Sequence, residues 1–325
     1  MWQYLILPIL IGFFTTLFFI PFWIKKAKEM GLVGRDIHKK KQNEVAESGG
    51  IPVIFGFVLG TLSYVAIITF LFSDSINLTQ IFVLLSTVLI ASLIAMIDDA
   101  FGWKKGLSKK SRLFFLFFAA IPLMVINAGD STMMGIEFGL FYPLLFIPLG
   151  IMGVTATFNF LAGYNGLETS QGIIILSGLA IALFLTEKKG LSLIALVMIF
   201  CLLAFYMFNK FPATIFPGDT LTYSVGALIG CLAILGDMEK LAVFFFIPYG
   251  IEAVLKIRGK LEKESFARVN KDGSLENRYD KIYGLEHLAV YVLSKMKKKV
   301  YEKDIVYLIN GFQILIILLG FLLIY

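Results

Sequence analysis

The sequence contains few residues of the kinds that bind zinc, with only two histidines and two cysteines among 325 residues. Zinc sites in proteins are built mainly from clustered Cys and His side chains. His38 and His287 are far apart in the chain, and Cys201 and Cys231 lie inside apolar stretches, where free thiols are normally buried. The G-x-x-x-x-G-K-[ST] pattern of a P-loop is also absent. We therefore expect neither a zinc site nor a P-loop ATPase.

Charge is scarce as well. Charged residues make up 16% of the chain, 58% of the residues are hydrophobic, and the mean hydropathy is +0.84. A soluble domain has about 25% charged residues, and here apolar runs long enough to cross a bilayer recur along the whole chain. We expect an all-α polytopic membrane protein with about ten transmembrane helices, at 3–23, 51–72, 78–97, 113–128, 136–158, 171–186, 191–208, 220–236, 241–255 and 306–325. Residues 1–325 are expected to form one integral membrane domain.

The basic residues give this bundle an orientation. The connections 24–50, 98–112, 159–170, 209–219 and 256–305 fall on one side of the membrane and hold 26 of the 29 Lys and Arg residues. The positive-inside rule makes that side cytoplasmic and puts both termini outside. The membrane would be the plasma membrane in a prokaryote and the endoplasmic reticulum in a eukaryote. The net charge of +6 is then a signal of topology, and no nucleic-acid partner is expected.

The longest polar segment, 256–305, is expected to be a small cytoplasmic insertion between the ninth and tenth helices. Within it, FARVNKDGSLENRY predicts a short hairpin that turns at Asp272-Gly273. The following LEHLAVYVLSKMKKK has the periodicity of an amphipathic helix with a basic end.

Carboxylates, amides and cations from three cytoplasmic loops form a candidate site. They are Asp98, Asp99, Asn159, Asn165, Glu168 and Asp219, with the cations Lys104, Lys105, Lys109, Lys110 and Arg112. Each has a simpler structural explanation: Asp219 as a helix N-cap, the Asp98-Asp99 pair as an interfacial helix end, the asparagines as turn residues, and the basic run as a topology signal. Their coincidence on one face favours a shared site. Carboxylate and amide oxygens suit Mg²⁺ or Mn²⁺, and the cations suit a diphosphate, so the residues predict metal-dependent phosphoryl transfer with a lipid substrate.

Four stretches between about residues 34 and 226 extend this pattern: GRDIHKKKQNEVAESGG, MIDDAFG, NFLAGYNGLETSQG and FPATIFPGDT. In this order and spacing they resemble the polyprenyl-phosphate N-acetylhexosamine-1-phosphate transferases, most of all the dolichyl-phosphate N-acetylglucosamine-phosphotransferase branch of eukaryotes and archaea. The resemblance implies that N-acetylglucosamine 1-phosphate passes from UDP-N-acetylglucosamine to a polyprenyl phosphate such as dolichyl phosphate, with release of UMP. This would be the first step of lipid-linked glycan assembly for protein N-glycosylation.

The resemblance also implies roles at the reacting phosphates. Asp219 and Asn159 match positions that bind Mg²⁺ and the pyrophosphate. Asp98 and Asp99 match paired aspartates beside the lipid phosphate and the metal. Arg112 falls where relatives usually have a phosphate-binding Lys. Direct in-line attack by the lipid phosphate is favoured, because a phosphate monoester is already largely ionised at neutral pH, with a second pKa of about 6; a general-base role for Asp98 and a covalent aspartyl-phosphate are the alternatives.

Further positions are implied for substrate binding. Asn165 belongs to the glycine-rich uracil-recognition stretch, which also includes Gly163, Gly166 and Glu168. Glu47 matches an acidic residue near the nucleotide. In the insertion, Lys263, Arg268 and Asn270 are the counterparts of the sugar-recognition motif. Relatives that act on the peptidoglycan pentapeptide carry a histidine-rich motif there, and its absence argues against that substrate.

Several alternatives stay open at the level of sequence. Another UDP-N-acetylhexosamine or undecaprenyl phosphate could serve in the same chemistry. A membrane transporter is the rival from a different class, but it needs charges near the bilayer midplane and access from both sides. A CDP-alcohol phosphotransferase needs a denser aspartate cluster. The lipid bilayer is an expected partner, and a homodimer is one option for the assembly.

Overall fold

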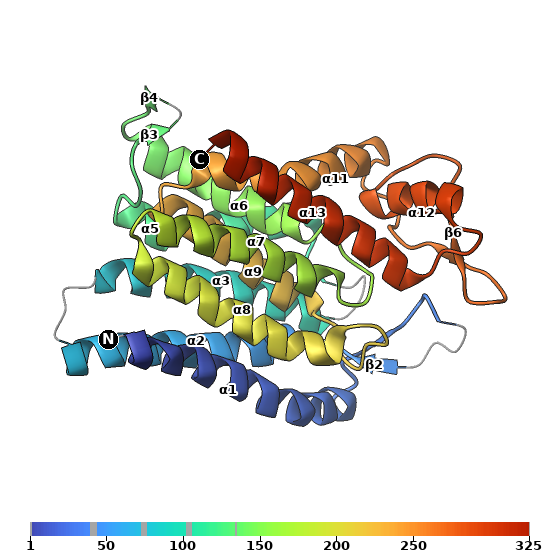
Figure 1. The fold of residues 1–325 in the computed structure, drawn as a ribbon, viewed down its shortest axis with the longest axis horizontal. Helices are drawn as coiled ribbons and strands as arrows, with labels where there is room; N and C mark the ends of the chain where they lie inside the picture. Colours follow the sequence, from blue (N-terminus) through green and yellow to red (C-terminus); the bar gives the residue numbers. More distant parts are fainter. Residues whose placement is uncertain (1, 40–43, 73–76, 102–105, 134, 325) are drawn as a thin grey trace.

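The computed structural model describes residues 2–39, 44–72, 77–101, 106–133 and 135–324. It is a bundle of long helices that run in similar directions (Figure 1). The long helices are α1 (Trp2–Glu29), α2 (Gly50–Ile67), α3 (Leu78–Phe101), α7 (Leu167–Leu185), α8 (Lys189–Asn209), α9 (Gly218–Leu235) and α13 (Glu302–Ile324). The shorter helical segments are η1 (Ile68–Phe72), α4 (Lys109–Ala119), α5 (Ile121–Val125), η2 (Tyr142–Phe146), α6 (Ile147–Phe158), α10 (Glu239–Phe245), α11 (Ile247–Arg258) and α12 (Leu285–Met296).

Three short antiparallel hairpins complete the described elements. They are β1 (Val33–Arg35) with β2 (Glu44–Ala46), β3 (Thr132–Met133) with β4 (Ile136–Glu137), and β5 (Arg268–Val269) with β6 (Leu275–Glu276). The last confirms the predicted hairpin, and Gly273 adopts φ +85° at its turn, a conformation that glycine tolerates best. The helix predicted after it is α12.

The predicted all-α membrane architecture is confirmed, and each of the ten predicted ranges overlaps helical structure, although the range 136–158 begins with strand β4. Seven described helices are long and apolar enough to cross a membrane, and Tyr142–Phe158 is a shorter apolar helix. The count of ten spans stays a prediction. The ranges 113–128 and 241–255 are not continuous helices: α4 gives way to α5 and α10 to α11, where Pro122 and Pro248 each lie at the start of the second helix. Proline lacks an N–H and clashes with the preceding turn, so each helix breaks there.

Helix α9 lies at the centre of the bundle. It packs between α3 and α6. In its most apolar stretch of 18 residues, 89% of the residues are buried, against 22% in the corresponding stretch of α1 at the edge. Gly226 makes the contact with α6 close, since a Cβ atom there would lie 2.8 Å from the Cα of Thr155. Small residues of this kind let helix backbones approach in a membrane protein. The position of the start of α9 is therefore fixed by its neighbours.

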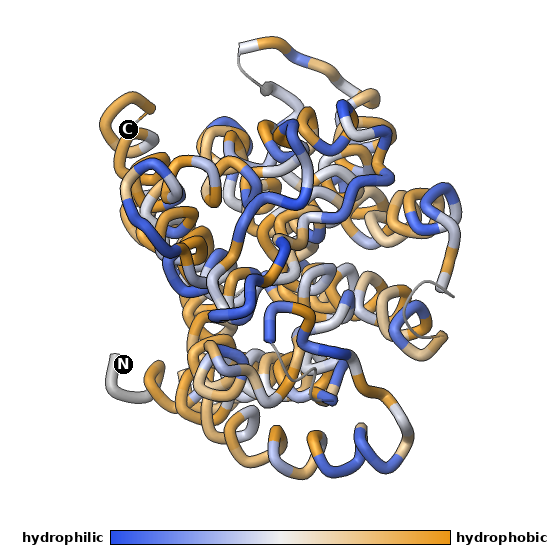
Figure 2. Tube along the Cα trace, turned by 90° about the vertical axis from the view of Figure 1, so that its right-hand side faces the viewer, coloured by the Kyte–Doolittle hydropathy of each residue, from blue (hydrophilic) through white to orange (hydrophobic). Residues whose placement is uncertain are grey.

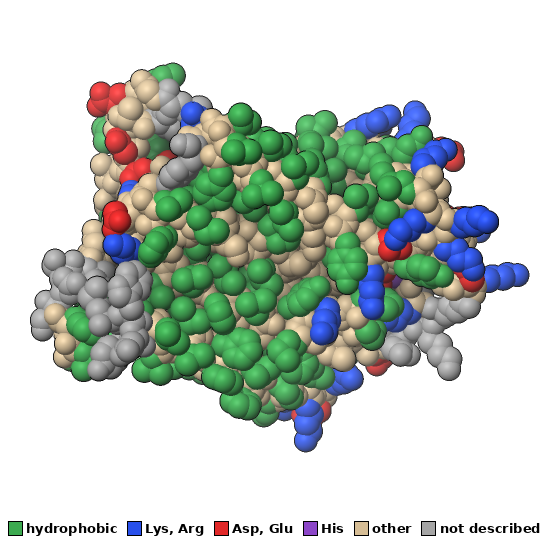
Figure 3. Space-filling model, viewed as in Figure 1, with side chains coloured by type: hydrophobic (Ala, Val, Ile, Leu, Met, Phe, Trp, Pro, Cys, Tyr) green, Lys and Arg blue, Asp and Glu red, His purple; other side chains and the backbone are tan. Residues whose placement is uncertain are grey.

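The two ends of the bundle differ in chemistry. Hairpin β3–β4 and both chain termini lie at one end, and β2, β6 and α12 lie at the other (Figure 1). An apolar surface covers the middle of the bundle, and Lys and Arg side chains gather at the α12 end (Figure 3). Figure 2 looks onto this end, where hydrophilic segments cross in front of the apolar helices. We call it the basic end. The loops that the sequence assigns to the side rich in Lys and Arg come together here.

Candidate active site

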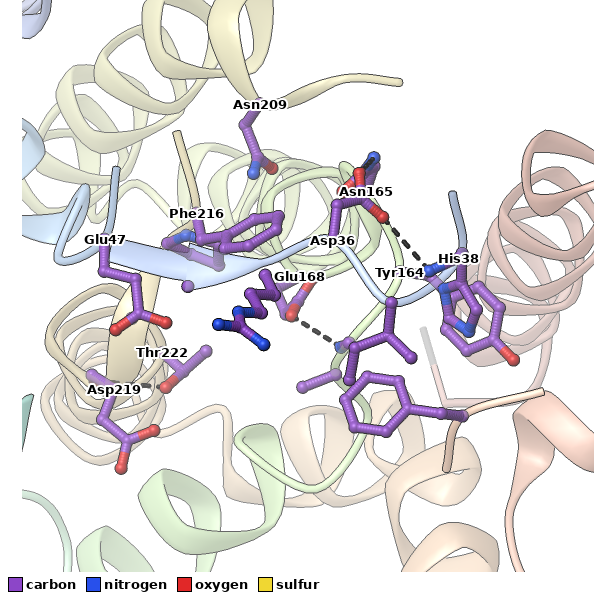
Figure 4. A pocket seen from close by; sticks show the side chains of 18 of the residues that line it. Asp36, His38, Glu47, Tyr164, Asn165, Glu168, Asn209, Phe216, Asp219 and Thr222 are labelled. Atoms are coloured by element: carbon purple, nitrogen blue, oxygen red, sulfur yellow. Dashed lines mark hydrogen bonds between the residues drawn. The ribbon is translucent and has the colours of Figure 1, made fainter. Parts of the chain in front are cut away.

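A cavity of about 680 Å³ opens at the basic end. Three segments that are distant in sequence line it: residues 33–38, the loop 159–168 and the start of α9. Single residues such as Glu47 and Phe266 complete the lining. In Figure 4, Asp219, Thr222 and Glu47 lie toward one end of the cavity, and Asp36, Asn165, His38 and Tyr164 toward the other. A volume of this size is in the usual range for a small-molecule site, about 300–1,000 Å³.

Asp219 lies in the first turn of α9, where it faces the cavity. Its Oδ2 accepts a hydrogen bond from Nη1 of Arg112 at 3.0 Å, and its Oδ1 accepts one from Nδ2 of Asn159 at 3.2 Å. Asn159 is held in turn by Thr222, whose hydroxyl donates to Oδ1 of Asn159 at 3.0 Å. The structure thus brings Asp219, Asn159 and Arg112 together. Asp219 makes no capping hydrogen bond to its own helix, so the N-cap explanation of this residue is wrong.

Arg112 bridges two acidic residues. Its Nη2 lies 2.6 Å from Oδ2 of Asp98, while Nη1 binds Asp219 and Nε donates to the carbonyl of Leu107 at 3.1 Å. The planar guanidinium has separate donors for each of these contacts, and a lysine ammonium does not have this fork geometry. Arg112 therefore forms a bridge between Asp98 and Asp219.

Asp98 and Asp99 lie inside the last turn of α3, and their carboxylates point to different partners. Asp98 is buried and also accepts a hydrogen bond from the backbone N–H of Leu107. Asp99 binds the start of α9: its Oδ1 accepts from the N–H of Asp219 at 2.9 Å, and its Oδ2 accepts from the N–H and the hydroxyl of Thr220 at 3.1 and 2.7 Å. Asp99 therefore caps a helix from another part of the chain, and neither aspartate lines the cavity.

The loop 159–168 folds around two glycines with positive φ. Gly163 has φ +105° and Gly166 has φ +83°, values that side-chain-bearing residues rarely adopt. The N–H of Gly163 donates to Oε1 of Glu168 at 2.9 Å, which closes the loop onto the start of α7. Asn165 donates from Nδ2 to Asp36 at 3.0 Å, and its backbone N–H donates to Glu302 at 2.6 Å. Gly163, Asn165 and Glu168 line the cavity as candidate substrate contacts, while Gly166 lies behind it against Tyr206.

Glu47 reaches the cavity because its segment is fastened to the start of α9. Ala46 pairs with Ile215 in an isolated parallel bridge, and the N–H of Phe216 donates to the carbonyl of Ala46 at 2.7 Å. Burial, and to a smaller extent the nearby Asp99, raise the pKa of Glu47 above its ordinary value. A carboxyl with a raised pKa in a cavity is a candidate functional group.

The predicted sugar contacts lie elsewhere. Lys263 packs over the ring of Tyr279 at 5.2 Å, Arg268 pairs with Glu276 at the surface, and Asn270 donates to Ser274 within the hairpin turn. None of the three lines the cavity in the described part of the chain; the insertion contributes Phe266 instead. The role of these three residues in sugar recognition stays a prediction. Lys104 and Lys105 lie outside the described residues.

Several lining residues had no role in the sequence prediction, among them Asp36, His38, Phe216, Thr222 and Phe266. Asp36 and His38 are in the GRDIH stretch, so a polar signal was present. Their partners are far away in the sequence: Asp36 binds Asn165, and the ring of His38 packs at a tilt against Tyr164 with centroids 4.4 Å apart. Phe216 and Phe266 gave no signal, because phenylalanine is so common in this chain.

An apolar groove of about 900 Å³ runs along α6 between η2, α10 and α11. Three glycines, Gly150, Gly153 and Gly250, leave it open, because a Cβ atom on any of them would meet nothing within 4 Å. The groove includes Thr157, and Asn159 in the cavity follows two residues later. Groove and cavity therefore come close at the end of α6.

Oxygen atoms are the groups available for a metal ion in the cavity. No group of three or more His, Cys, Asp and Glu side chains among the described residues is arranged to hold a metal ion by itself. Asp219 and Asn159 offer carboxylate and amide oxygens, which fit a hard dication that takes its other ligands from water and substrate phosphates, as Mg²⁺ commonly does. Here the Asn159 oxygen faces Thr222, so metal binding would replace this hydrogen bond.

Comparison with known proteins decides the family. The model of glycosyl transferase family 4 matches residues 81–237. A protein of Saccharolobus solfataricus, provisionally named a UDP-N-acetylglucosamine–dolichyl-phosphate N-acetylglucosaminephosphotransferase, is 40% identical over 278 residues, which cover 83% of each chain. The chain belongs to glycosyl transferase family 4. The predicted resemblance to the phosphotransferase branch is confirmed, and the protein is a multi-pass membrane enzyme.

Other members of the family extend the likeness. A protein of Sulfolobus acidocaldarius with the same provisional name is 31% identical over 326 residues, or 97% of this chain and 95% of that protein. The UDP-N-acetylglucosamine–dolichyl-phosphate N-acetylglucosaminephosphotransferase of Dictyostelium discoideum is 27% identical over 286 residues, or 73% of this chain and 69% of that protein.

Proposed function

We propose that this enzyme transfers N-acetylglucosamine 1-phosphate from UDP-N-acetylglucosamine to a polyprenyl phosphate of the dolichyl type, with Mg²⁺ as cofactor and with the cavity on the cytoplasmic side. The printed names of the relatives supply the substrates, and the concentration of basic side chains supports the orientation. The observation on which the proposal chiefly rests is that the groove and the cavity both reach the end of α6, through Thr157 and Asn159; we call this place the junction.

This junction suits a reaction between a water-soluble donor and a lipid acceptor. The cavity has polar and charged walls, whereas nearly all residues of the groove are apolar. A prenyl chain in the groove would bring its phosphate toward the end of α6, close to Asn159 and Asp219. The diphosphate of a nucleotide sugar in the cavity would reach the same place, because Asp219 lies at one end of the cavity (Figure 4).

The residues at this junction fit the charges of the reaction. An ionised oxygen of the lipid phosphate attacks the sugar-bearing phosphorus, a new P–O bond forms, and the bond to the bridging oxygen breaks so that UMP leaves with the electron pair. Arg112 offers a guanidinium that can bind phosphate oxygens, the geometry for which arginine is suited. Asp219 and Asn159 would hold Mg²⁺, which would supply positive charge that stabilises the leaving phosphate. No proton has to be removed from the acceptor, since a phosphate monoester has a second pKa of about 6.

The remaining walls suit the nucleoside and the sugar. Asn165 and Asp36 provide polar side chains at the end away from the diphosphate, Glu47 lies nearer to it, and Phe216 and Phe266 provide aromatic faces. Gly163 keeps the backbone close to any ligand on its side of the cavity. In this proposal the loop 159–168 recognises uracil, and the insertion between α11 and α13 contacts the donor.

The test is transfer of radiolabel from a panel of UDP-sugars to dolichyl and undecaprenyl phosphate by the purified enzyme in nanodiscs, with and without EDTA. We expect transfer from UDP-N-acetylglucosamine to dolichyl phosphate, equimolar release of UMP, and loss of both with EDTA. Preferential use of another UDP-N-acetylhexosamine or of undecaprenyl phosphate would replace the named substrate and keep the chemistry. Lack of transfer with every pair would refute the proposal.

A further inference from the structure

The insertion between α11 and α13 reaches the cavity through an aromatic ring. Among its residues, only Phe266 lines the cavity in the described part of the chain. The ring is packed against Gly163, where a Cβ atom would lie 2.8 Å from Cε1 of Phe266, and its centroid is 5.6 Å from that of His38. Phe266 is therefore a wall at the end of the cavity away from Asp219.

Two side chains hold the backbone next to this ring. The hydroxyl of Tyr164 donates to the carbonyl of Ser265 at 3.3 Å. Nζ of Lys256, on α11, donates to Oγ of Ser265 at 2.5 Å. Ser265 itself is buried; its contact with Tyr164 is buried, and its contact with Lys256 is partly buried. The position of Phe266 thus depends on its neighbour Ser265, and Ser265 depends on Lys256.

Lys256 is partly buried and lies beside two buried glutamates. Its Nζ lies 3.4 Å from Oε1 of Glu252, and the other oxygen of Glu252 accepts from the N–H of Leu285 at the start of α12. Glu286 lies beside them, fully buried like Glu252. Burying charged groups costs several kcal/mol each before pairing, and an apolar core of the same shape is often equally stable. A partly buried lysine beside two fully buried glutamates therefore suggests a purpose other than stability.

We propose that Lys256 is a positioning residue for the donor: through Ser265 it orients Phe266 as the wall against which an uncharged face of the nucleotide sugar packs. The inference rests on the proposed function, since it takes the donor to be a UDP-sugar in this cavity. Lys256 lines no part of the cavity, so its effect on the donor is indirect. The uncharged face is either the uracil ring or the acetamido side of the sugar, and both can pack on an aromatic ring.

The experiment measures the affinity for UMP and for UDP-N-acetylglucosamine by calorimetry, and kcat and KM of transfer, on the full-length enzyme in nanodiscs. Phe266→Ala, Lys256→Met and Ser265→Ala should each weaken donor binding, by about tenfold for Phe266→Ala, the scale of one lost stacking contact. KM should rise while kcat changes little. Lys256→Arg should restore most of the affinity, and Lys295→Met, an exposed lysine on α12, should match the wild type.

The double variant Lys256→Met/Phe266→Ala separates positioning from general damage. If Lys256 acts through the ring, the double variant binds no more weakly than Phe266→Ala alone. Equal losses for UMP and UDP-N-acetylglucosamine assign the ring to the nucleoside, and a loss for UDP-N-acetylglucosamine alone assigns it to the sugar. Ser265→Ala leaves Lys256, Glu252 and Glu286 in place, so it tests the contact between Lys256 and Ser265 even if Lys256→Met does not fold.

Two results would overturn the inference: wild-type affinity in folded Lys256→Met or Ser265→Ala protein, or losses that simply add in the double variant. Failure of the proposed function looks different, because the wild-type enzyme itself would then neither bind nor transfer a UDP-sugar. In that case the positioning role falls with it.

Discussion

Replacement of Asp99 distinguishes a helix cap from a metal or phosphate ligand. Its carboxylate accepts three hydrogen bonds from the start of α9, two from backbone N–H groups and one from the hydroxyl of Thr220. In the Asp99→Ala protein both N–H groups lose their partner. A buried donor without a partner costs about 1–3 kcal/mol, and loss of an N-cap costs about 0.5–2 kcal/mol.

These values predict a loss of about 2–4 kcal/mol in the free energy of unfolding for Asp99→Ala, since the cap and the N–H contributions overlap. Asp99→Asn keeps one acceptor oxygen but turns an amide N–H₂ toward a donor, so we expect the free energy of unfolding to fall by about 1–2 kcal/mol. Gly218 shows how close this contact is, because a Cβ atom there would lie 2.5 Å from Oδ2 of Asp99. Activity should fall together with stability, because the same contact fixes Asp219.

The assay is urea unfolding in detergent, combined with the Mg²⁺ dependence of transfer. Thr220→Val is the matched variant: it removes the hydroxyl that binds Asp99 and leaves the carboxylate unchanged. In the wild-type background it should lower the free energy of unfolding by about 1 kcal/mol. In the Asp99→Ala background it should lower it much less, because both changes break the same contact. If Asp99 were a metal ligand, the Asp99→Asn protein would be as stable as the wild type or more stable, because repulsion from Asp98 is relieved. Its transfer activity would then need far more Mg²⁺. That result would refute the capping argument.

Three further predictions concern the metal, the buried acids and the topology. Asp219→Asn should reduce transfer by at least about 10²-fold without unfolding the protein, whereas Asp272→Asn, at the exposed hairpin turn, should not; near-normal turnover of folded Asp219→Asn protein would contradict this. Burial and the nearby Glu252 raise the pKa of Glu286 well above its ordinary value, so the folded state keeps a proton that the unfolded state releases. Its stability then falls by up to about 1.4 kcal/mol per pH unit as the pH rises from the ordinary glutamate pKa through the raised one. Glu286→Gln should therefore melt progressively higher than the wild type as the pH rises, and parallel melting curves would exclude this. In a background without Cys201 and Cys231, which are both buried, Lys110→Cys and Lys271→Cys should be labelled from the cytoplasmic side and Thr132→Cys from the other; labelling of all three from one side would refute the orientation.

Hydrophobic patterning was enough to locate the helices, because a segment that crosses a bilayer must be apolar over nearly its whole length. It could not locate the breaks before α5 and α11, where one proline interrupts an otherwise uniform apolar run. The motif residues Asp219, Asn159, Gly163 and Asn165 could be assigned to one site, since they lie in loops on the same side. Their mutual contacts could not be predicted, because Asn165 meets Asp36 across 129 positions of the chain.

The insertion was the least predictable part of the site. Lys263, Arg268 and Asn270 were predicted only as the counterparts of the family's sugar-recognition motif. The hairpin satisfies them locally instead: Asn270 binds Ser274 in its own turn, and Arg268 pairs with Glu276 across the strands. A short polar hairpin has many such internal partners, and composition alone cannot tell which side chains remain available for a ligand.

The adjacent aspartates at the end of α3 have a structural explanation in their separate partners. Asp98 holds Arg112, and Arg112 binds the carboxylate of Asp219. Asp99 holds the backbone of Asp219 through the first N–H groups of α9, which carry partial positive charge. Each acid is therefore neutralised by a different positive group, which offsets the repulsion between them. Because the two contacts fix the side chain and the backbone of the same residue, the pair defines where Asp219 presents its oxygens, without either aspartate entering the cavity.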